Sequence, residues 1–322
     1  MIQSPSGSAW IAIEARRSLS PAEAGNLLPR LAQILRSMSG DSPVLIVAPW
    51  LSPRTQELLA GQGVNYLDQT GNALIKLINP AVYIETEGAA RNPDPKERGA
   101  IRLRGPKVGR LIRTLVDVSP PYMLKDLADS TGLAPGYISR ILDSLNEEAM
   151  IKRAPRGPVE FVDAPALLRR WAASYDVFGS NRATTYIARE GLEAIREALA
   201  MESRQGAQIA VTGSVAAALL SPVASPTLLL AYTPEPERLA QRLDLLPADE
   251  GANVGLLLPF DTIVWKRTRW DEGLQLAAAS QVAVDCLTGN GRMPAEGEAI
   301  LSWMGQDESL WRSDQLEVPG HW

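Results

Sequence analysis

The sequence predicts a multidomain α/β protein, and three observations lead to that fold class. The chain has 322 residues, which exceeds one typical domain and is enough to form several hydrophobic cores. Apolar runs typical of buried strands alternate with segments of helical periodicity near the N-terminus and again after about residue 180. Between these regions, residues 122–161 show a different order of signals: helix, glycine turn, helix and β-hairpin.

This central order of signals is typical of a winged helix-turn-helix. A first helix is expected over about residues 123–130, and Gly132 supplies a tight turn for which a positive φ is expected. A second helix is expected to open at Pro135, whose missing N–H costs nothing in a first turn. Apolar side chains that recur at i, i+3, i+4 and i+7 give this helix one buried face: Ile138, Ile141, Leu142 and Leu145.

Basic residues gather around this motif, although the formal charge of the whole chain is −5. Between positions 91 and 113 only Asp94 and Glu97 oppose the following basic residues: Arg91, Lys96, Arg98, Arg102, Arg104, Lys107, Arg110 and Arg113. A basic hairpin is expected after the second helix, with strands at 150–153 and 159–161. A winged helix that binds only protein is the alternative, but it has no need of this cluster, whereas phosphate neutralisation does.

The sequence therefore predicts a DNA-binding transcriptional regulator that recognises double-stranded DNA of specific sequence. Early residues of the second helix meet base edges in such motifs, and the expected base contacts are Tyr137 and Arg140. The expected phosphate contacts are Ser139, Lys125, Lys107 and Arg104. The hairpin residues, expected on phosphates or in the minor groove, are Lys152, Arg153 and Arg156. Roughly five to eight phosphate contacts predict a log–log salt slope of about −5 to −7, also for an isolated fragment of residues 96–175.

Changes in composition divide the chain into five segments. The segments are an N-terminal α/β domain (1–88), a basic linker (89–106), the winged helix-turn-helix domain (107–176), a C-terminal α/β domain (177–305) and a polar tail (306–322). The N-terminal domain is expected to place strands at 9–14, 43–50, 64–68, 73–78 and 81–85, with helices at 21–37 and 52–60. Among the elements expected in the C-terminal domain are helices at 186–199 and 280–287 and a strand at 263–266.

The N-terminal domain resembles the restriction-endonuclease-like (PD-(D/E)XK) fold. The resemblance rests on residues 11–38, IAIEARRSLSPAEAGNLLPRLAQILRSM, and on residues 43–75, PVLIVAPWLSPRTQELLAGQGVNYLDQTGNALI. The family's Glu-x-Lys position is occupied here by Glu14-Ala15-Arg16, and arginine cannot release a proton at neutral pH. Eight residues before the strand leave no room for the family's earlier metal-binding aspartate, and Asp68 lies far downstream. A non-catalytic module for DNA contact or dimerisation is expected, with a metal-dependent DNA nuclease as the alternative.

The C-terminal domain resembles the nucleotidyltransferase-like domain of the AbiEi family, the antitoxins and repressors of type IV toxin–antitoxin systems. The resembling residues are 208–233, QIAVTGSVAAALLSPVASPTLLLAYT, and 280–304, SQVAVDCLTGNGRMPAEGEAILSWM. Active nucleotidyltransferases follow Gly-Ser with metal-binding carboxylates on the next strand, but the strand after Gly213-Ser214 carries none. A degenerate domain that keeps this fold but lacks transferase chemistry is expected. The resemblance also implies an alternative function, an antitoxin that opposes a partner toxin.

Composition narrows the classes further. The single cysteine, Cys286, excludes a disulfide within the chain, and the single histidine, His321, disfavours histidine triads and Cys/His zinc sites. No apolar run reaches the twenty residues of a membrane span, and no signal peptide is recognisable, so a cytoplasmic location is expected. The sequence predicts a protein that is not an enzyme and holds no cofactor or metal. A homodimer is expected from operator symmetry alone.

Overall fold

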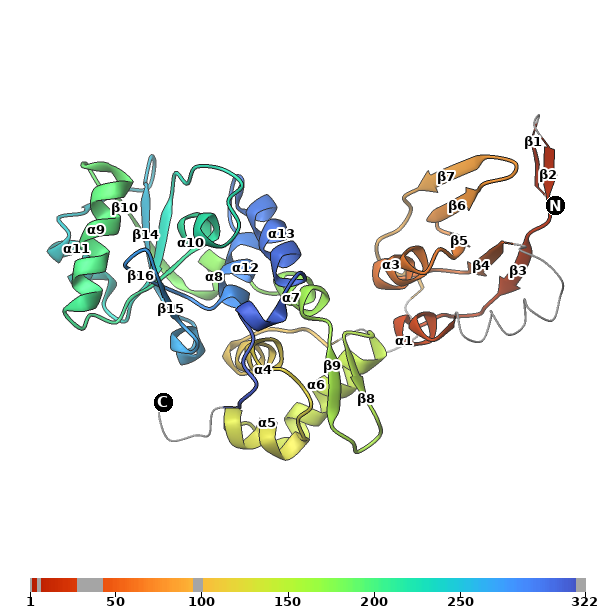
Figure 1. The fold of residues 1–322 in the computed structure, drawn as a ribbon, viewed down its shortest axis with the longest axis horizontal. Coiled ribbons are helices and arrows are strands. Elements are labelled where there is room, and N and C mark those ends of the chain that lie inside the picture. Colours follow the sequence, from red (N-terminus) through yellow and green to blue (C-terminus); the bar gives the residue numbers. More distant parts are fainter. Residues whose placement is uncertain (1, 5–6, 28–42, 95–100, 317–322) are drawn as a thin grey trace. The chain divides into compact units, whose positions relative to one another are not determined.

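A computed structural model of the chain describes residues 2–4, 7–27, 43–94 and 101–316 (Figure 1). The protein is mixed α/β with several sheets, as the sequence predicts. Two compact units are distinguishable, residues 1–101 with 141–151 and residues 102–140 with 152–322. The predicted boundary between the winged helix and the C-terminal domain, at 176–177, falls inside the second unit.

A five-stranded sheet forms the centre of the first unit, in the order β3-β4-β5-β6-β7. Its strands are β3 (Ala12–Ala15), β4 (Val44–Ala48), β5 (Asn65–Asp68), β6 (Ala73–Leu77) and β7 (Val82–Thr86). Strands β3, β4 and β5 are parallel, and β6 pairs antiparallel with both β5 and β7. A separate hairpin pairs β1 (Ile2–Ser4) with β2 (Gly7–Ala9). The strands predicted at 43–50, 64–68, 73–78 and 81–85 are confirmed, whereas β3 begins three residues later than predicted.

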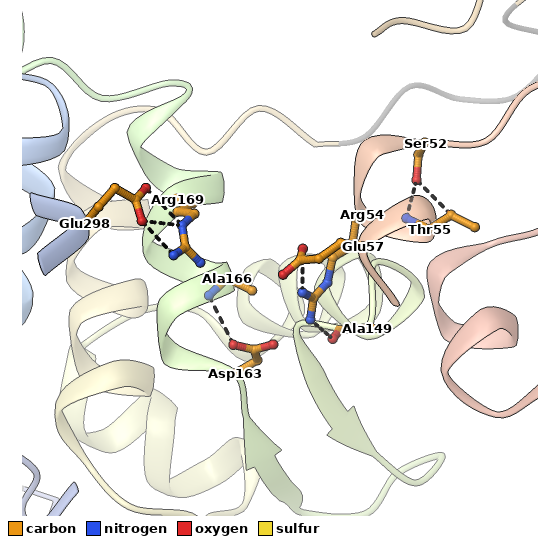
Figure 2. A network of polar contacts seen from close by, with 9 residues as sticks. All are labelled: Ser52, Arg54, Thr55, Glu57, Ala149, Asp163, Ala166, Arg169 and Glu298. Atoms are coloured by element: carbon orange, nitrogen blue, oxygen red, sulfur yellow. Dashed lines mark hydrogen bonds and ion pairs between the residues drawn. The ribbon is translucent and has the colours of Figure 1, made fainter. Parts of the chain in front are cut away.

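Two helices of the first unit, α1 (Pro21–Gly25) and α3 (Pro53–Gly61), begin with the same Ser-Pro signal. Ser20 and Ser52 accept hydrogen bonds from the backbone N–H groups of the first turn, and Figure 2 shows the cap at Ser52. Leucines from this region pack with β4 and β5 into one core, which includes Leu19, Leu27, Ile46, Leu59 and Tyr66. The remainder of the helix predicted over 21–37 falls largely on residues 28–42, outside the described part of the chain.

The central elements appear in the predicted order. They are α4 (Pro106–Asp117), α5 (Leu124–Thr131), α6 (Pro135–Glu147), β8 (Ile151–Arg153) and β9 (Val159–Val162). Gly132 ends α5 in the left-handed conformation with φ of 67°, which glycine adopts without the cost of a Cβ clash. The four predicted apolar positions of α6 are all buried, and β8 pairs with β9 in a two-stranded sheet.

A seven-stranded sheet dominates the rest of the second unit, in the order β13-β10-β14-β12-β11-β16-β15. Its strands are β10 (Arg182–Ile187), β11 (Ala210–Thr212), β12 (Leu229–Tyr232), β13 (Leu246–Pro247), β14 (Val254–Leu258), β15 (Arg269–Asp271) and β16 (Leu274–Leu276). Helices α9 (Gly191–Arg204) and α11 (Pro236–Arg242) lie on one side of this sheet. Helices α10 (Gly213–Leu220), α12 (Ala279–Leu287) and α13 (Met293–Met304) lie on the other (Figure 1).

Two further helices lead from the central segment into this sheet, α7 (Ala164–Ala172) and α8 (Val177–Ser180). Asp163 caps α7 by accepting a hydrogen bond from the N–H of Ala166, and Arg169 of α7 forms an ion pair with Glu298 of α13 (Figure 2). The ion pair connects α7 to α13, which is one of the helices that cover the seven-stranded sheet. No helix in the described ranges is long and apolar enough to cross a membrane.

In the second unit, the helix predicted over 186–199 begins later than predicted, and the strand predicted over 263–266 is wrong. Residues 186–187 belong to strand β10 rather than to a helix, because the preceding threonines and Tyr186 favour a strand, and α9 begins only at Gly191. Residues 263–266 were expected as a strand but largely form the 3-10 helix η1 (Thr262–Trp265). Asp261 starts this turn by accepting a hydrogen bond of 2.9 Å from the N–H of Ile263.

The described part of the predicted tail, 306–316, contacts the end of α4 through Ser313. After the short 3-10 helix η2 (Glu308–Leu310), Ser313 pairs with the end of α4. The N–H of Ser119 donates to the carbonyl of Ser313, and the N–H of Ser313 donates to the carbonyl of Asp117, at 2.8 and 3.0 Å. These bonds satisfy backbone groups where α4 ends.

Candidate nucleic-acid interface

All nine predicted DNA-contacting residues lie in the second unit. Six of their side chains are exposed: Arg104, Lys107, Lys125, Arg140, Lys152 and Arg156. The other three are half-buried: Tyr137, Ser139 and Arg153. They come from the segment before α4 and from α4, α5, α6, β8 and the hairpin turn, so no single run of sequence supplies them.

The turn between α5 and α6 is held by hydrogen bonds from its own residues. Asp126 accepts from the N–H of Met123 at 2.8 Å and thereby caps α5. At the other end of α5, the hydroxyl of Thr131 donates to the carbonyl of Leu127 at 2.6 Å and accepts from the N–H of Leu133 at 3.3 Å. With Gly132 left-handed between them, these bonds fix the direction in which α6 starts.

Tyr137 and Arg140 form a pair at the start of α6. The guanidinium carbon of Arg140 lies 5.7 Å from the centre of the Tyr137 ring, a distance typical of a cation–π contact. Ile138, between them in sequence, is fully buried, whereas Arg140 is exposed. The helical spacing therefore places Arg140 in solvent and Tyr137 at the edge of the surface, while buried Ile138 anchors the helix.

The hairpin presents a basic residue at its turn. Arg156 adopts a positive φ of 59°, and the N–H of Gly157 donates to the carbonyl of Ala154 at 2.9 Å. Lys152 is exposed on β8, and Phe161 on β9 has 52% of its surface exposed. Cationic groups thus stand on both the strand and the turn of this hairpin.

The basic run at 91–113 is less available than its sequence indicates. Arg113 is completely buried and forms an ion pair of 2.8 Å with Asp117, and Arg110 forms an ion pair of 2.8 Å with Asp261. Helix α4 is amphipathic, and these two arginines lie on positions where they meet carboxylates of the same unit. The interpretation of both as part of an open phosphate-binding run is therefore wrong. Lys96 and Arg98 lie outside the described residues.

Arg110 has a second role that the sequence did not reveal. Its Nε and Nη2 donate to the two carboxylate oxygens of Asp261, at 3.2 and 2.8 Å. Its Nη1 donates to the carbonyl of Thr131 at 3.1 Å. One guanidinium therefore joins the C-terminal domain to the residue immediately before the turn glycine, and a bidentate arginine is well suited to such a fixed geometry.

The carboxylates considered for metal chemistry in the first unit have partners. Glu14 forms an ion pair of 2.8 Å with Arg16. Asp68 accepts hydrogen bonds from Leu51, Thr70 and Asn72. Burial alone would raise the pKa of Asp68, but these hydrogen bonds outweigh it and lower the pKa below its usual range. Within the described part of the chain, no group of three or more His, Cys, Asp or Glu side chains could hold a metal ion.

The serine of the Gly-Ser motif in the C-terminal domain is hydrogen-bonded to a glutamate. The hydroxyl of Ser214 donates to Glu296 of α13 at 2.6 Å, and both side chains are buried. Gly213 has a φ of 64°, and a Cβ there would lie 3.0 Å from the side chain of Leu230. The motif therefore serves a tight strand-to-helix turn, with the serine hydroxyl already bonded.

A buried polar network around Asp285 was missed from the sequence. Asp285 of α12 is fully buried, and its carboxylate accepts from Thr212, Tyr175, Tyr232 and Gln281 at 2.6 to 2.9 Å. Burial raises the pKa of Asp285 to about 6, although the four donors oppose the increase. The available signal was a glutamine and an aspartate at i, i+4 in a largely apolar helix.

Comparison of the chain with protein-family models, with curated proteins and with solved structures finds no match. The two family resemblances therefore rest only on the residues quoted for them.

Proposed function

We propose that this protein is a sequence-specific DNA-binding transcriptional regulator that acts through a winged helix-turn-helix formed by α4 to β9. The observation that carries the proposal is the contact between half-buried Tyr137 and exposed Arg140 near the start of α6, directly after a turn fixed by hydrogen bonds. Side chains at the start of the second helix of such a motif meet base edges when the helix enters the major groove.

Charge around the pair supports nucleic acid as the partner. Five exposed basic side chains lie in the same unit as the pair and are proposed to contact phosphates: Arg104, Lys107, Lys125, Lys152 and Arg156. Phosphate contacts of this kind position a protein on the duplex, whereas base contacts determine its sequence preference. The proposed division of labour is therefore base recognition by Arg140 and Tyr137, with Ser139 and the basic residues on the backbone. Arg153, half-buried on β8, is proposed to act with the other hairpin residues.

The flanking domains are proposed to have no catalytic role. Glu14 forms an ion pair with Arg16, and the hydroxyl of Ser214 donates a hydrogen bond to Glu296. The residues considered for hydrolysis or nucleotidyl transfer are therefore proposed to stabilise local structure. Purified protein should leave plasmid, single-stranded DNA, RNA and labelled nucleotides unchanged with magnesium or manganese. Turnover that disappears in Glu14→Ala would establish a nuclease, and turnover that disappears in Ser214→Ala would establish a transferase.

The function is tested with the full-length protein and a library of randomised duplexes. Selection at low salt should enrich one motif, and an inverted repeat of that motif would support the proposed homodimer. Arg189→Ala is the matched control for Arg140→Ala, because Arg189 is an exposed arginine between β10 and α9, outside the proposed interface. This control should select the same motif as the wild type. No enrichment, together with no binding to any duplex at low salt, would refute the proposal.

A further inference from the structure

We propose that the second unit contains a binding site for a small, uncharged aromatic molecule whose occupancy changes the affinity for DNA. The site is a cavity of about 170 Å³, partly open to solvent, beside the first turn of α4. Its walls include Leu103, Pro106, Trp171, Ser174, Tyr175 and Phe260. The regulatory part of this proposal rests on the proposed DNA-binding function, whereas the binding site itself does not.

Three aromatic rings form a tightly packed wall of the cavity. The centre of the Trp171 ring lies 4.9 Å from that of Tyr175 and 6.2 Å from that of Phe260. Tyr175 and Phe260 meet edge to face at 5.5 Å. Gly109 of α4 makes this packing possible, since a Cβ there would lie 2.6 Å from Phe260 and 3.0 Å from Trp171.

Size and chemistry indicate the class of ligand. An apolar cavity of about 150 Å³ accommodates benzene in a well-studied engineered protein, so this cavity has room for one six-membered ring. None of its lining side chains carries a charge, which favours a neutral molecule. The hydroxyl of Tyr175 is already bonded to Asp285, and that of Ser180 accepts from the N–H of Asp176, whereas Ser174 adds a further hydroxyl to the lining. A phenol, with one ring and one hydroxyl, fits these properties.

The cavity is connected to the turn of the proposed DNA-binding motif. Phe260 in its wall precedes Asp261, whose carboxylate holds Arg110, and Arg110 bonds to the carbonyl of Thr131. A ligand ring bound beside Phe260 lies next to this series of contacts, which ends at Thr131, the residue before Gly132. The ligand changes the affinity for DNA if it binds one conformation of the turn between α5 and α6 more tightly than another.

Binding is tested by calorimetric titration of phenol into the full-length protein. One saturable site with a dissociation constant of about 0.1–1 mM is expected for a ligand of this size. Ser174→Phe fills the cavity and should weaken binding at least about tenfold, whereas Ala173→Phe adds the same ring at an exposed neighbouring position and should not. Absence of saturable binding up to about 10 mM, or equal binding by wild type and Ser174→Phe, would overturn the proposal.

A crystallographic measurement covers the case in which Ser174→Phe does not fold. The anomalous signal of 4-bromophenol bound to the wild-type protein should place the bromine among Trp171, Tyr175 and Phe260, and a bromine found only elsewhere would contradict the site. Saturating phenol should also change the affinity for the selected duplex at least about threefold in wild type and not in Ser174→Phe. Unchanged DNA affinity despite binding would refute the regulatory part. Phenol binding without any DNA binding would refute the proposed function and leave the ligand site intact.

Discussion

Arg113 of α4 donates a hydrogen bond of 2.8 Å to the side chain of Gln281 in α12, across 168 positions of sequence. The same guanidinium forms an ion pair with Asp117, which in turn accepts a hydrogen bond from Ser280 of α12. The first helix of the proposed DNA-binding motif is therefore joined to the C-terminal sheet domain by buried polar contacts. Three predictions about stability and folding can be measured before the function itself is tested.

Arg113→Ala should strongly destabilise the protein. The change leaves the carboxylate of Asp117 buried without its ionic partner, and breaking one side of a buried pair costs about 3–5 kcal/mol. Urea unfolding monitored by circular dichroism measures this loss. Arg102→Ala removes an exposed arginine from the same region and should change the free energy of unfolding by less than about 0.5 kcal/mol. Equal effects of both changes would show that the buried pair has no special role.

The isolated fragment 96–175 should fold poorly, contrary to what the sequence alone indicates. It lacks Asp261 and Gln281, so Arg110 and Arg113 lose partners that they have in the full chain. The fragment 102–316 keeps both and should unfold more cooperatively and at higher urea. A cooperative transition of the short fragment at the midpoint of the longer one would show that these contacts contribute little.

Asp285 should make the stability depend on pH. Because its pKa in the folded protein, about 6, lies above its ordinary value of 3.8, the folded state binds the proton more tightly than the unfolded state. Stability from this group is fully present below pH 3.8 and is lost as pH rises through 6. Between pH 7 and pH 5 the wild type should gain roughly 1 kcal/mol relative to Asp285→Asn. Parallel pH profiles of the two proteins would contradict this.

The sequence predicted the elements whose signals are local. The Ser-Pro helix starts at 20–21 and 52–53, the turn at Gly132 and the apolar face of α6 all depend on neighbours within a few residues. The prediction failed where a contact with a residue distant in sequence determines whether a side chain is exposed. Arg110 pairs with Asp261, 151 positions away, and Arg113 bonds to Gln281, 168 positions away, in addition to its near neighbour Asp117. The sequence did not indicate that these long-range contacts bury or engage the two arginines. The predicted DNA contacts are exposed or half-buried, and their role stays a prediction.

Salt dependence should report the number of phosphate contacts. Since Arg110 and Arg113 are engaged within the protein, about five proposed phosphate contacts remain, and the log–log slope of DNA affinity against salt should be about −4 to −5. Lys152→Ala should make the slope shallower by about 1. Fluorescence anisotropy over a salt series measures both values. A slope near zero would contradict the proposed phosphate contacts as a whole. A slope unchanged by Lys152→Ala would show that Lys152 does not contact a phosphate.

The most direct test of the central claim compares the base preference of wild type, Arg140→Ala and Lys152→Ala in selection from randomised duplexes. Arg140→Ala should relax the preference at one or two positions and cost about 1–3 kcal/mol on the best site. Lys152→Ala should weaken binding to all sequences by similar factors. An unchanged motif for Arg140→Ala, or a wild-type protein that selects no motif, would contradict sequence recognition by the start of α6.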